Sequence, residues 1–443
     1  MTEHAALPSA RYDLDRPRLS ALGALDESAR REYWAALALR CTEGLGSHSI
    51  CTLLKFFGSA WEAVQNLPSW EEAGIDQSKA RTFSTEQWRK AAKPEWDAAK
   101  KLQGHILLWT DTRYPRYLRE LDDAPALLYA VGDLSLLSSP CVAVVGSRKC
   151  SQAALDFTTI VAEELSAAGI TVVSGMAFGI DARAHRSALK GPGRTIAVLA
   201  TGVDVPYPAH HTELYRKIAA QGLILGELPL GTKPSPWAFP VRNRIVSGLS
   251  LGVLMVEAES EKSGSLITAR LAAEQGRSVY VPAPDAIRAA YKEGTKSLLN
   301  SGAFPIWRAS DLMADLFPHL KRMAAPVCPP AVPAPRKKEQ EEKADVKVAP
   351  APTVSSNSSQ ELPKKSAPAP SPASRPAMPA LSADEEALLS LLGSGPLSPD
   401  DLLLAAQEHD AAWSAPRLMA ALMMLEVKGQ VRRLSDSRYE VCA

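Results

Sequence analysis

The sequence lacks the long apolar runs and the paired cysteines that define several classes of protein. None of its 443 residues lie in a stretch long and apolar enough to span a membrane, and residues 1–18 lack the apolar segment of a signal peptide. The six cysteines form no C-x-x-C pair, which disfavours a structural zinc site and favours reduced thiols. We therefore expect a cytoplasmic protein that makes no contact with a membrane.

An excess of charge of one sign is also missing. The 50 Lys and Arg residues balance 49 Asp and Glu residues, which leaves a net charge of +1. This balance excludes a polybasic protein, so any site for nucleic acid must be a local patch. The hydrophobic share of 46% suffices for a packed core, and the length indicates two or three domains.

Two common nucleotide-binding fingerprints are absent. The first turn between an expected strand and helix reads GSRKCS, residues 146–151, instead of G-x-G-x-x-G, and no acidic residue ends the next strand. A site for a nicotinamide dinucleotide needs both features. The sequence also contains no G-x-x-x-x-G-K-[ST], which disfavours a P-loop nucleoside triphosphatase.

Side chains that can act as acids or bases are scattered along the chain. His185 lies on an expected helix, while Asp181, Asp204, Glu227 and Glu257 come near the ends of expected strands. Paired carboxylates at such positions can exchange protons. Helix capping and charge balance explain them equally well, however. We therefore predict no catalytic residue, no metal site and no cofactor.

Short apolar runs alternate with helical patterns from Cys141 to Trp307. The runs are CVAVVG, ITVVSG, RTIAVLATG, LILGE, LGVLMVEA and SVYVPA. This alternation predicts an α/β fold with a Rossmann-like, doubly wound and mostly parallel sheet. Ligands of such sheets bind at the carboxyl ends of the strands.

The loops at these carboxyl ends carry small, polar and basic residues. They cover residues 146–149, 174–181, 201–204, 239–244 and 263–265. A glycine after a strand is often only turn geometry, but five such loops at one edge indicate a binding surface. The last loop precedes a helix, whose N-terminal N–H groups bind phosphate. Residues 141–310 contain 18 Lys and Arg against 13 Asp and Glu, which permits a polyanionic ligand.

The flanking regions differ from this central domain, which we place at residues 111–323 with a lead-in segment. Residues 1–110 are expected to form a helical domain, and the helices around Gly44 to Gly46 follow a helix-hairpin-helix or SAM-like pattern. A plain αα-hairpin explains that pattern equally well, and basic residues beside the turn are sparse. We therefore assign no DNA-binding residue to this hairpin, and whether it contacts DNA stays open.

Two further segments follow the central domain. Residues 324–380 are rich in Pro, Ala, Ser and Lys and are expected to form a disordered linker. Residues 381–443 predict three helices and a β-hairpin, which together make a winged helix. Such modules bind DNA or dock proteins, and the basic candidates for DNA are Arg417, Lys428, Arg432 and Arg433.

Long motifs in the central domain resemble the DNA-processing protein A family, DprA/Smf. They are VAVVGSRKCS, VVSGMAFGIDARAH, RTIAVLATGVDVPYP, FPVRNRIVSGLS and VEAESEKSGSLITARLAAEQGRSVY, in this order. The resemblance covers the whole α/β domain, and the helical start and winged-helix end fit the family's layout. It implies a non-enzymatic homodimer that binds and protects single-stranded DNA and helps load RecA recombinase during natural transformation.

The resemblance also implies which residues bind DNA. They are Gly146, Ser147, Arg148, Lys149, Ser174, Gly175, Lys233, Phe239, Arg242, Asn243, Arg244, Gly264, Ser265, Thr268 and Lys296. Phe239 is expected to stack on a base, while Arg148 and Arg244 suit bidentate contacts with phosphate. Two departures from the family pattern, Ala283 for glycine and Lys296 for an amide, put the fine shape of the pocket in question.

Two alternative functions stay open at this point. One is a nucleotide-processing enzyme similar to the phosphoribohydrolases, which share the fold but carry a Pro-Gly-Gly-x-Gly-Thr segment followed by a catalytic Glu. This chain has EKSGSLIT at that place, residues 261–268. The other is an interaction scaffold whose pocket holds a small nucleotide signal.

Overall fold

A computed structural model describes most of the chain. It covers residues 20–287, 291–324, 383–393, 395–410, 413, 417–418, 421–422, 425, 430–434 and 438–442. Across these residues, no helix combines the length and apolarity that crossing a membrane requires. The expected linker, 324–380, lies outside the described residues except for Ala324, which ends helix α13.

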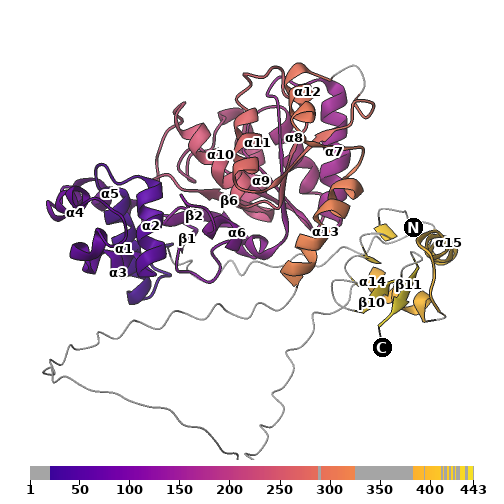
Figure 1. Ribbon diagram of the computed structural model, residues 1–443, viewed down its shortest axis with the longest axis horizontal. Helices are drawn as coiled ribbons and strands as arrows, with labels where there is room; N and C mark the ends of the chain where they lie inside the picture. The colour runs from indigo at the N-terminus through magenta and orange to yellow at the C-terminus, as the bar shows by residue number, and fades with distance from the viewer. Residues whose placement is uncertain are drawn as a thin grey trace, which may run out of the picture.

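A nine-stranded sheet forms the centre of the molecule (Figure 1). Its strands are β1 (His105–Leu108), β2 (Leu127–Gly132), β3 (Cys141–Val145), β4 (Thr171–Ser174), β5 (Thr195–Val198), β6 (Leu223–Gly226), β7 (Gly252–Met255), β8 (Ser278–Pro282) and β9 (Phe304–Ile306). They lie in the order β1-β2-β6-β5-β4-β3-β7-β8-β9. All neighbours from β6 to β9 pair in parallel, so the predicted doubly wound, mostly parallel sheet is confirmed.

Helices cover both faces of this sheet because its strands are apolar on both sides. Along β3, Val142 and Val144 pack into one apolar layer, while Ala143 and Val145 pack into the opposite one. Helices α7, α8 and α13 share the first layer, and α10 and α11 share the second. The helices of this part are α6 (Arg116–Arg119), α7 (Gln152–Ala167), α8 (Ile180–Ala188), α9 (Thr212–Gln221), α10 (Ala238–Gly248), α11 (Leu266–Glu274), α12 (Glu293–Asn300) and α13 (Ala309–Ala324), with short 3-10 turns η2 (Leu134–Ser138) and η3 (Ala209–His211).

Both edges of the sheet extend beyond what the sequence pattern indicates. Strand β1 pairs antiparallel with β2, which in turn pairs antiparallel with β6. The sheet therefore begins before the domain boundary that we expected at residue 110. Strand β9 adds a parallel edge beside β8. Strand β9 has only three residues, too few to show a period, and our sequence reasoning did not identify β1.

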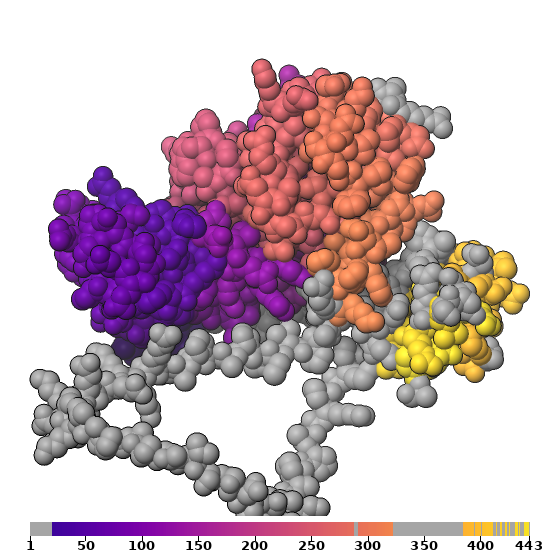
Figure 2. Space-filling view, in the orientation of Figure 1, coloured from indigo at the N-terminus to yellow at the C-terminus, as the bar shows by residue number. Residues whose placement is uncertain are grey.

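The N-terminal region is helical, as predicted, and it packs against the β1–β2 edge (Figures 1 and 2). Its elements are α1 (Glu27–Arg40), α2 (Ser47–Phe57), α3 (Ala60–Gln65), η1 (Leu67–Trp70), α4 (Gln77–Ser84) and α5 (Arg89–Ala99). Helices α1 and α2 flank the glycine turn, where Gly44 has φ +76° and Leu45 is buried. Its basic neighbour Arg40 points into the protein, where it pairs with Glu95.

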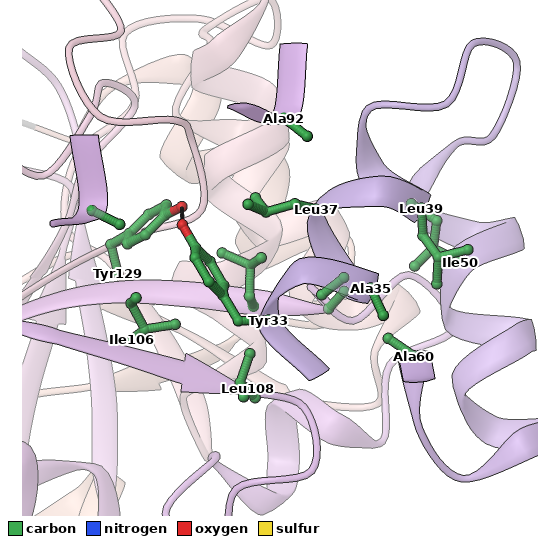
Figure 3. Close-up of a cluster of buried hydrophobic side chains, with 14 of the residues drawn as sticks. Tyr33, Ala35, Leu37, Leu39, Ile50, Ala60, Ala92, Ile106, Leu108 and Tyr129 are labelled. Carbon is green, nitrogen blue, oxygen red and sulfur yellow. Dashed lines mark hydrogen bonds between the residues drawn. The ribbon is translucent and has the colours of Figure 1, made fainter. Parts of the chain in front are cut away.

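A buried polar network joins this helical region to the sheet. The hydroxyl groups of Tyr33 on α1 and Tyr129 on β2 lie 2.7 Å apart (Figure 3), and Tyr129 also donates to the Glu95 carboxylate. Arg40 forms an ion pair with Glu95 and donates to the backbone oxygen of Glu227 at 2.8 Å. Burial alone would lower the pKa of Arg40, but the charge of Glu95 outweighs it and raises the pKa. Helices and sheet therefore share one satisfied polar junction.

The described part of the C-terminal region forms a separate small core. Helices α14 (Ala383–Leu392) and α15 (Pro399–His409) pack with the antiparallel strands β10 (Val431–Arg433) and β11 (Tyr439–Val441). Residues 417–418, 421–422 and 425 are helical, as the predicted third helix requires, and the rest of that helix lies outside the described residues. Ser398 caps α15 by accepting from the amide of Asp401.

We expect Arg40→Ala to lower the free energy of unfolding by about 3 kcal/mol, because it leaves the buried Glu95 carboxylate without its counter-ion. Urea denaturation followed by tryptophan fluorescence measures the change. Arg89→Ala is the matched control, because its ion pair with Glu86 is exposed on both sides, and we expect it to leave the midpoint in place. If both substitutions shifted the unfolding midpoint equally, the stabilising role of the buried Arg40–Glu95 pair would be contradicted.

Candidate nucleic-acid interface

Helix α10 is anchored across the carboxyl ends of two strands by the side chain of Arg242. Its guanidinium donates to the backbone oxygens of Gly175, 2.7 Å away after β4, and of Val198 at the end of β5. Burial lowers the pKa of Arg242 to about 10, while the nearby Asp181 raises it, so the group stays charged at neutral pH. A Cβ atom on Gly175 would lie 2.4 Å from this guanidinium, which explains why glycine is needed there.

The loops beside α10 enclose a cavity of about 1080 Å³. It lies where the strand order reverses between β3 and β7, the position at which doubly wound sheets bind ligands. Eleven of the fifteen predicted residues line it: Gly146, Ser147, Arg148, Lys149, Gly175, Phe239, Arg242, Asn243, Gly264, Ser265 and Thr268. The structure thus brings together loops that are far apart in sequence, although DNA contact by them stays a prediction.

The rim of the cavity combines positive charge with aromatic rings. Arg148 and Lys149 are exposed, and the Arg148 guanidinium lies 5.4 Å from the centre of the Phe239 ring. Tyr207 also lines the cavity, with its ring centre 5.8 Å from that of Phe239. Our sequence reasoning assigned no role to Tyr207, although it follows an expected strand end inside a family motif.

Four predicted residues do not line the cavity, and three of them, Ser174, Lys233 and Lys296, have local roles or exposed positions. The buried Ser174 hydroxyl donates to the backbone oxygen of Val144 at 2.7 Å, so it cannot reach a ligand. Lys233 is exposed on the loop before α10. Lys296 is exposed on α12, where its Nζ lies 3.9 Å from a carboxylate oxygen of Glu293. The lysines can still attract a polyanion at longer range.

Arg244 requires a correction, because the structure gives it no access to a phosphate. Its side chain is 6% exposed, and its Nη2 donates to both carboxylate oxygens of Glu227 at 2.7 and 2.6 Å. Asp123 lies 3.3 Å from its Nε. Burial opposes the charge of Arg244, but these two carboxylates outweigh it and raise the pKa. Arg244 therefore fixes α10 to the end of β6 instead of binding DNA.

Carboxylates of the protein itself occupy the turns that bind phosphate in many related folds. Glu257 accepts from the Ser151 amide at 3.2 Å and from its hydroxyl at 2.6 Å, directly at the N-terminus of α7. Asp181 accepts from the amides of Gly175 and Ala177 at 3.1 and 3.3 Å. A second anion at either turn would meet this negative charge, which disfavours a dinucleotide there.

The N-terminus of α11 is also less open than we expected. The amides of its first residues, Leu266, Ile267 and Thr268, donate to the backbone oxygens of residues 263–265. Attraction of a phosphate at the cavity therefore depends mainly on the side chains of Arg148 and Lys149.

His185 does not line the cavity, and its side chain has a structural environment. His185 is fully buried, burial lowers its pKa to about 3, and its Nδ1 lies 2.7 Å from the hydroxyl of Thr195. It is therefore neutral and structural. Within the described ranges, no three His, Cys, Asp or Glu residues are grouped closely enough to hold a metal ion.

The winged helix offers a poorer surface for DNA. Residues 381–443 contain ten Asp and Glu against five Lys and Arg. Arg417 pairs with both Asp384 and Asp410, and Arg432 pairs with Glu440. Two of the four basic residues that we proposed for DNA contact are therefore already neutralised; the side chains of Lys428 and Arg433 lie outside the description.

Comparison with known proteins agrees with this architecture. The profile of the family described as DNA recombination-mediator protein A matches residues 105–317, and that of the DprA winged helix domain matches residues 368–437. The DNA processing protein DprA of Bacillus subtilis is 39% identical over 267 residues, which span 60% of this chain and 89% of that protein. The chain belongs to the DprA/Smf family.

Further relatives support this membership. Protein Smf of Synechocystis is 36% identical over 302 residues, which span 65% of this chain and 73% of that protein. The crystal structure of DNA processing protein A from Streptococcus pneumoniae superposes with a TM-score of 0.55 at 33% identity. The match covers 64% of this chain and 97% of that one. The predicted family, fold class and winged helix are thereby confirmed.

The two cavity glycines provide a test of the site's geometry. We expect Gly175→Ala to lower the free energy of unfolding by about 1–3 kcal/mol, because its methyl group displaces the Arg242 guanidinium. Gly264→Ala is the matched control, since nothing lies within 4 Å of its added Cβ, and it should change stability by less than about 0.5 kcal/mol. Thermal unfolding measures both variants, and a neutral Gly175→Ala would contradict the anchoring of α10.

Proposed function

We propose that this DprA/Smf protein binds single-stranded DNA in the cavity at the carboxyl end of its sheet and hands the strand to RecA. The observation that carries the proposal is the rim, where the exposed Arg148 lies against the Phe239 ring, Tyr207 packs beside that ring, and Lys149 is exposed on the loop of Arg148. Proteins that bind single strands without sequence preference combine basic side chains with aromatic stacking surfaces. The bases of a single strand are free to reach such rings, whereas those of a duplex are stacked on each other.

The cavity suits a strand better than a free nucleotide. Glu257 and Asp181 hold the backbone amides that would grip the phosphates of a nucleotide. The remaining cations, Arg148 and Lys149, are at the exposed rim, where they can follow a backbone that enters and leaves. This arrangement argues against the nucleotide-signal scaffold.

We further infer that the protein acts by binding, without catalysis. An enzyme similar to the phosphoribohydrolases needs a carboxylate that is free to meet its substrate. Here Asp181 and Glu257 are buried and accept hydrogen bonds from loop groups, and the exposed Glu259 at the cavity lies 3.5 Å from the Lys292 ammonium.

The proposed homodimer has a suitable surface at the β9 edge. Phe304 is 51% exposed there and borders a hollow of about 670 Å³ whose apolar lining includes Leu266, Val279 and Leu298. Exposed apolar surface of this kind marks protein contacts. We place the contact between two copies at this edge of the sheet.

Fluorescence anisotropy of a labelled poly-dT oligomer against salt concentration tests the function. We expect the logarithm of the wild-type binding constant to fall steeply with the logarithm of salt. The slope should become shallower by about 1.4 in Arg148→Ala/Lys149→Ala, because each lost phosphate contact accounts for about 0.7 with single strands. Both side chains are exposed, so the fold should be unaffected.

Arg417→Ala is the matched control, because it removes an arginine that is already paired within the winged helix. It should leave both affinity and slope unchanged. Failure of the wild-type protein to bind single strands at low salt would refute the proposed function. Binding that survives the double substitution would place the site elsewhere in the chain.

A further inference from the structure

Three side chains meet in a row at the rim of the cavity. The guanidinium of Arg148 lies 5.4 Å from the centre of the Phe239 ring, within the range of a cation–π contact. On the same ring, Tyr207 packs at a centre-to-centre distance of 5.8 Å and an angle of 53°. Phe239 therefore has neighbours that use the ring surface a stacking base would need.

The side chain of Tyr207 is more exposed than that of Phe239. It is 38% exposed while it lines the cavity, whereas Phe239 is only partly exposed and lies against the guanidinium. A flat ring with a free face at the mouth of a cavity is the group on which a base can stack without displacing another side chain.

The chain around Tyr207 is well fixed, as a stacking surface requires. In the loop after β5, the Thr201 hydroxyl donates to the backbone oxygen of Val205, and the hydroxyl of Tyr215 on α9 donates to that of Val203. Asp204 accepts from the amide of Gly231 at 2.8 Å. These bonds hold the loop just before Tyr207 in one place.

Phe239 is equally fixed, but its position favours a different task. It lies three residues before Arg242, whose guanidinium anchors α10 to the ends of β4 and β5. Arg148, in contrast, is an exposed side chain on the loop after β3. The ring of Phe239 supplies a fixed surface that restricts where this flexible cation can lie.

We propose that Tyr207 is the residue on which a base stacks, and that Phe239 is a positioning residue that holds Arg148 toward the DNA phosphate. The proposal rests on the proposed function and divides the work at its site. Arg148, held in place by Phe239, attracts the phosphate, and Tyr207 stacks on the base.

Two readouts on one oligomer separate these tasks. A short poly-dT strand with a single central 2-aminopurine loses fluorescence when that base stacks on an aromatic ring, and the salt slope of binding counts phosphate contacts. We expect Tyr207→Leu to abolish the quenching and to weaken binding about 10- to 100-fold at an unchanged slope, as for loss of one stacked base. Phe239→Leu should keep the quenching and make the slope shallower by about 0.7.

Conservative variants keep the test valid if a leucine disturbs the fold. Tyr207→Phe retains a ring and should retain the quenching, and Phe239→Tyr should retain the wild-type slope. Phe56→Leu is the matched control, because this ring is 51% exposed on α2, packs against Phe57 and does not line the cavity. It should change neither readout.

The outcomes distinguish this inference from the proposed function. Loss of quenching in Phe239→Leu together with its retention in Tyr207→Leu would overturn the division of tasks, as would loss of both readouts in both variants. In either case the wild-type protein would still bind single strands. If the wild-type protein does not bind the oligomer at all, the proposed function itself fails.

Discussion

The buried guanidinium of Arg242 is the interaction on which the candidate site depends. It joins α10 to the backbone oxygens after β4 and at the end of β5, where the sheet would otherwise expose unpaired acceptors. Because Gly175 has no side chain, the guanidinium can approach the loop closely. The helix that carries Phe239 and Asn243 is thereby held over the carboxyl end of the sheet.

A second buried arginine extends this framework to the N-terminal helices. Arg244 binds the Glu227 carboxylate, while Arg40 of α1 binds the backbone oxygen of the same residue. The helical region, the end of β6 and α10 therefore meet at one residue. A buried pair of this kind contributes little net stability, but it is costly to break, and so it fixes how the parts are arranged. This gives the N-terminal helices a role in shaping the site.

Much of this arrangement could be predicted from the sequence because it depends on local pattern. Strands β3 to β7 are apolar runs followed by glycine-containing loops, and their alternation with helices dictates that the loops converge. The tasks of single residues depend on distant partners instead. Arg242 and Arg244 stand two positions apart in one motif, yet only the structure shows that Arg244 is bound by Glu227 and Asp123.

The roles of Glu257 and Tyr207 also depend on partners that are distant in the sequence. Nothing near Glu257 in the sequence reveals that it binds Ser151 at the start of α7, more than one hundred positions earlier. Tyr207 reaches the cavity only because the loop after β5 folds beside α10, which brings its ring to Phe239. Edge strands β1 and β9 are short, so their place in the sheet follows from pairing and not from their own pattern.

Photochemical crosslinking would test the central claim, that the cavity at the carboxyl end of the sheet is the site for single-stranded DNA. An oligomer containing 5-bromodeoxyuridine, irradiated in complex with the full chain, attaches to the side chains that its bases contact. Mass spectrometry of the digested complex should then find the oligomer on the peptides that contain Tyr207 and Phe239. Crosslinks confined to α1–α5 or to residues 381–443 would contradict the account.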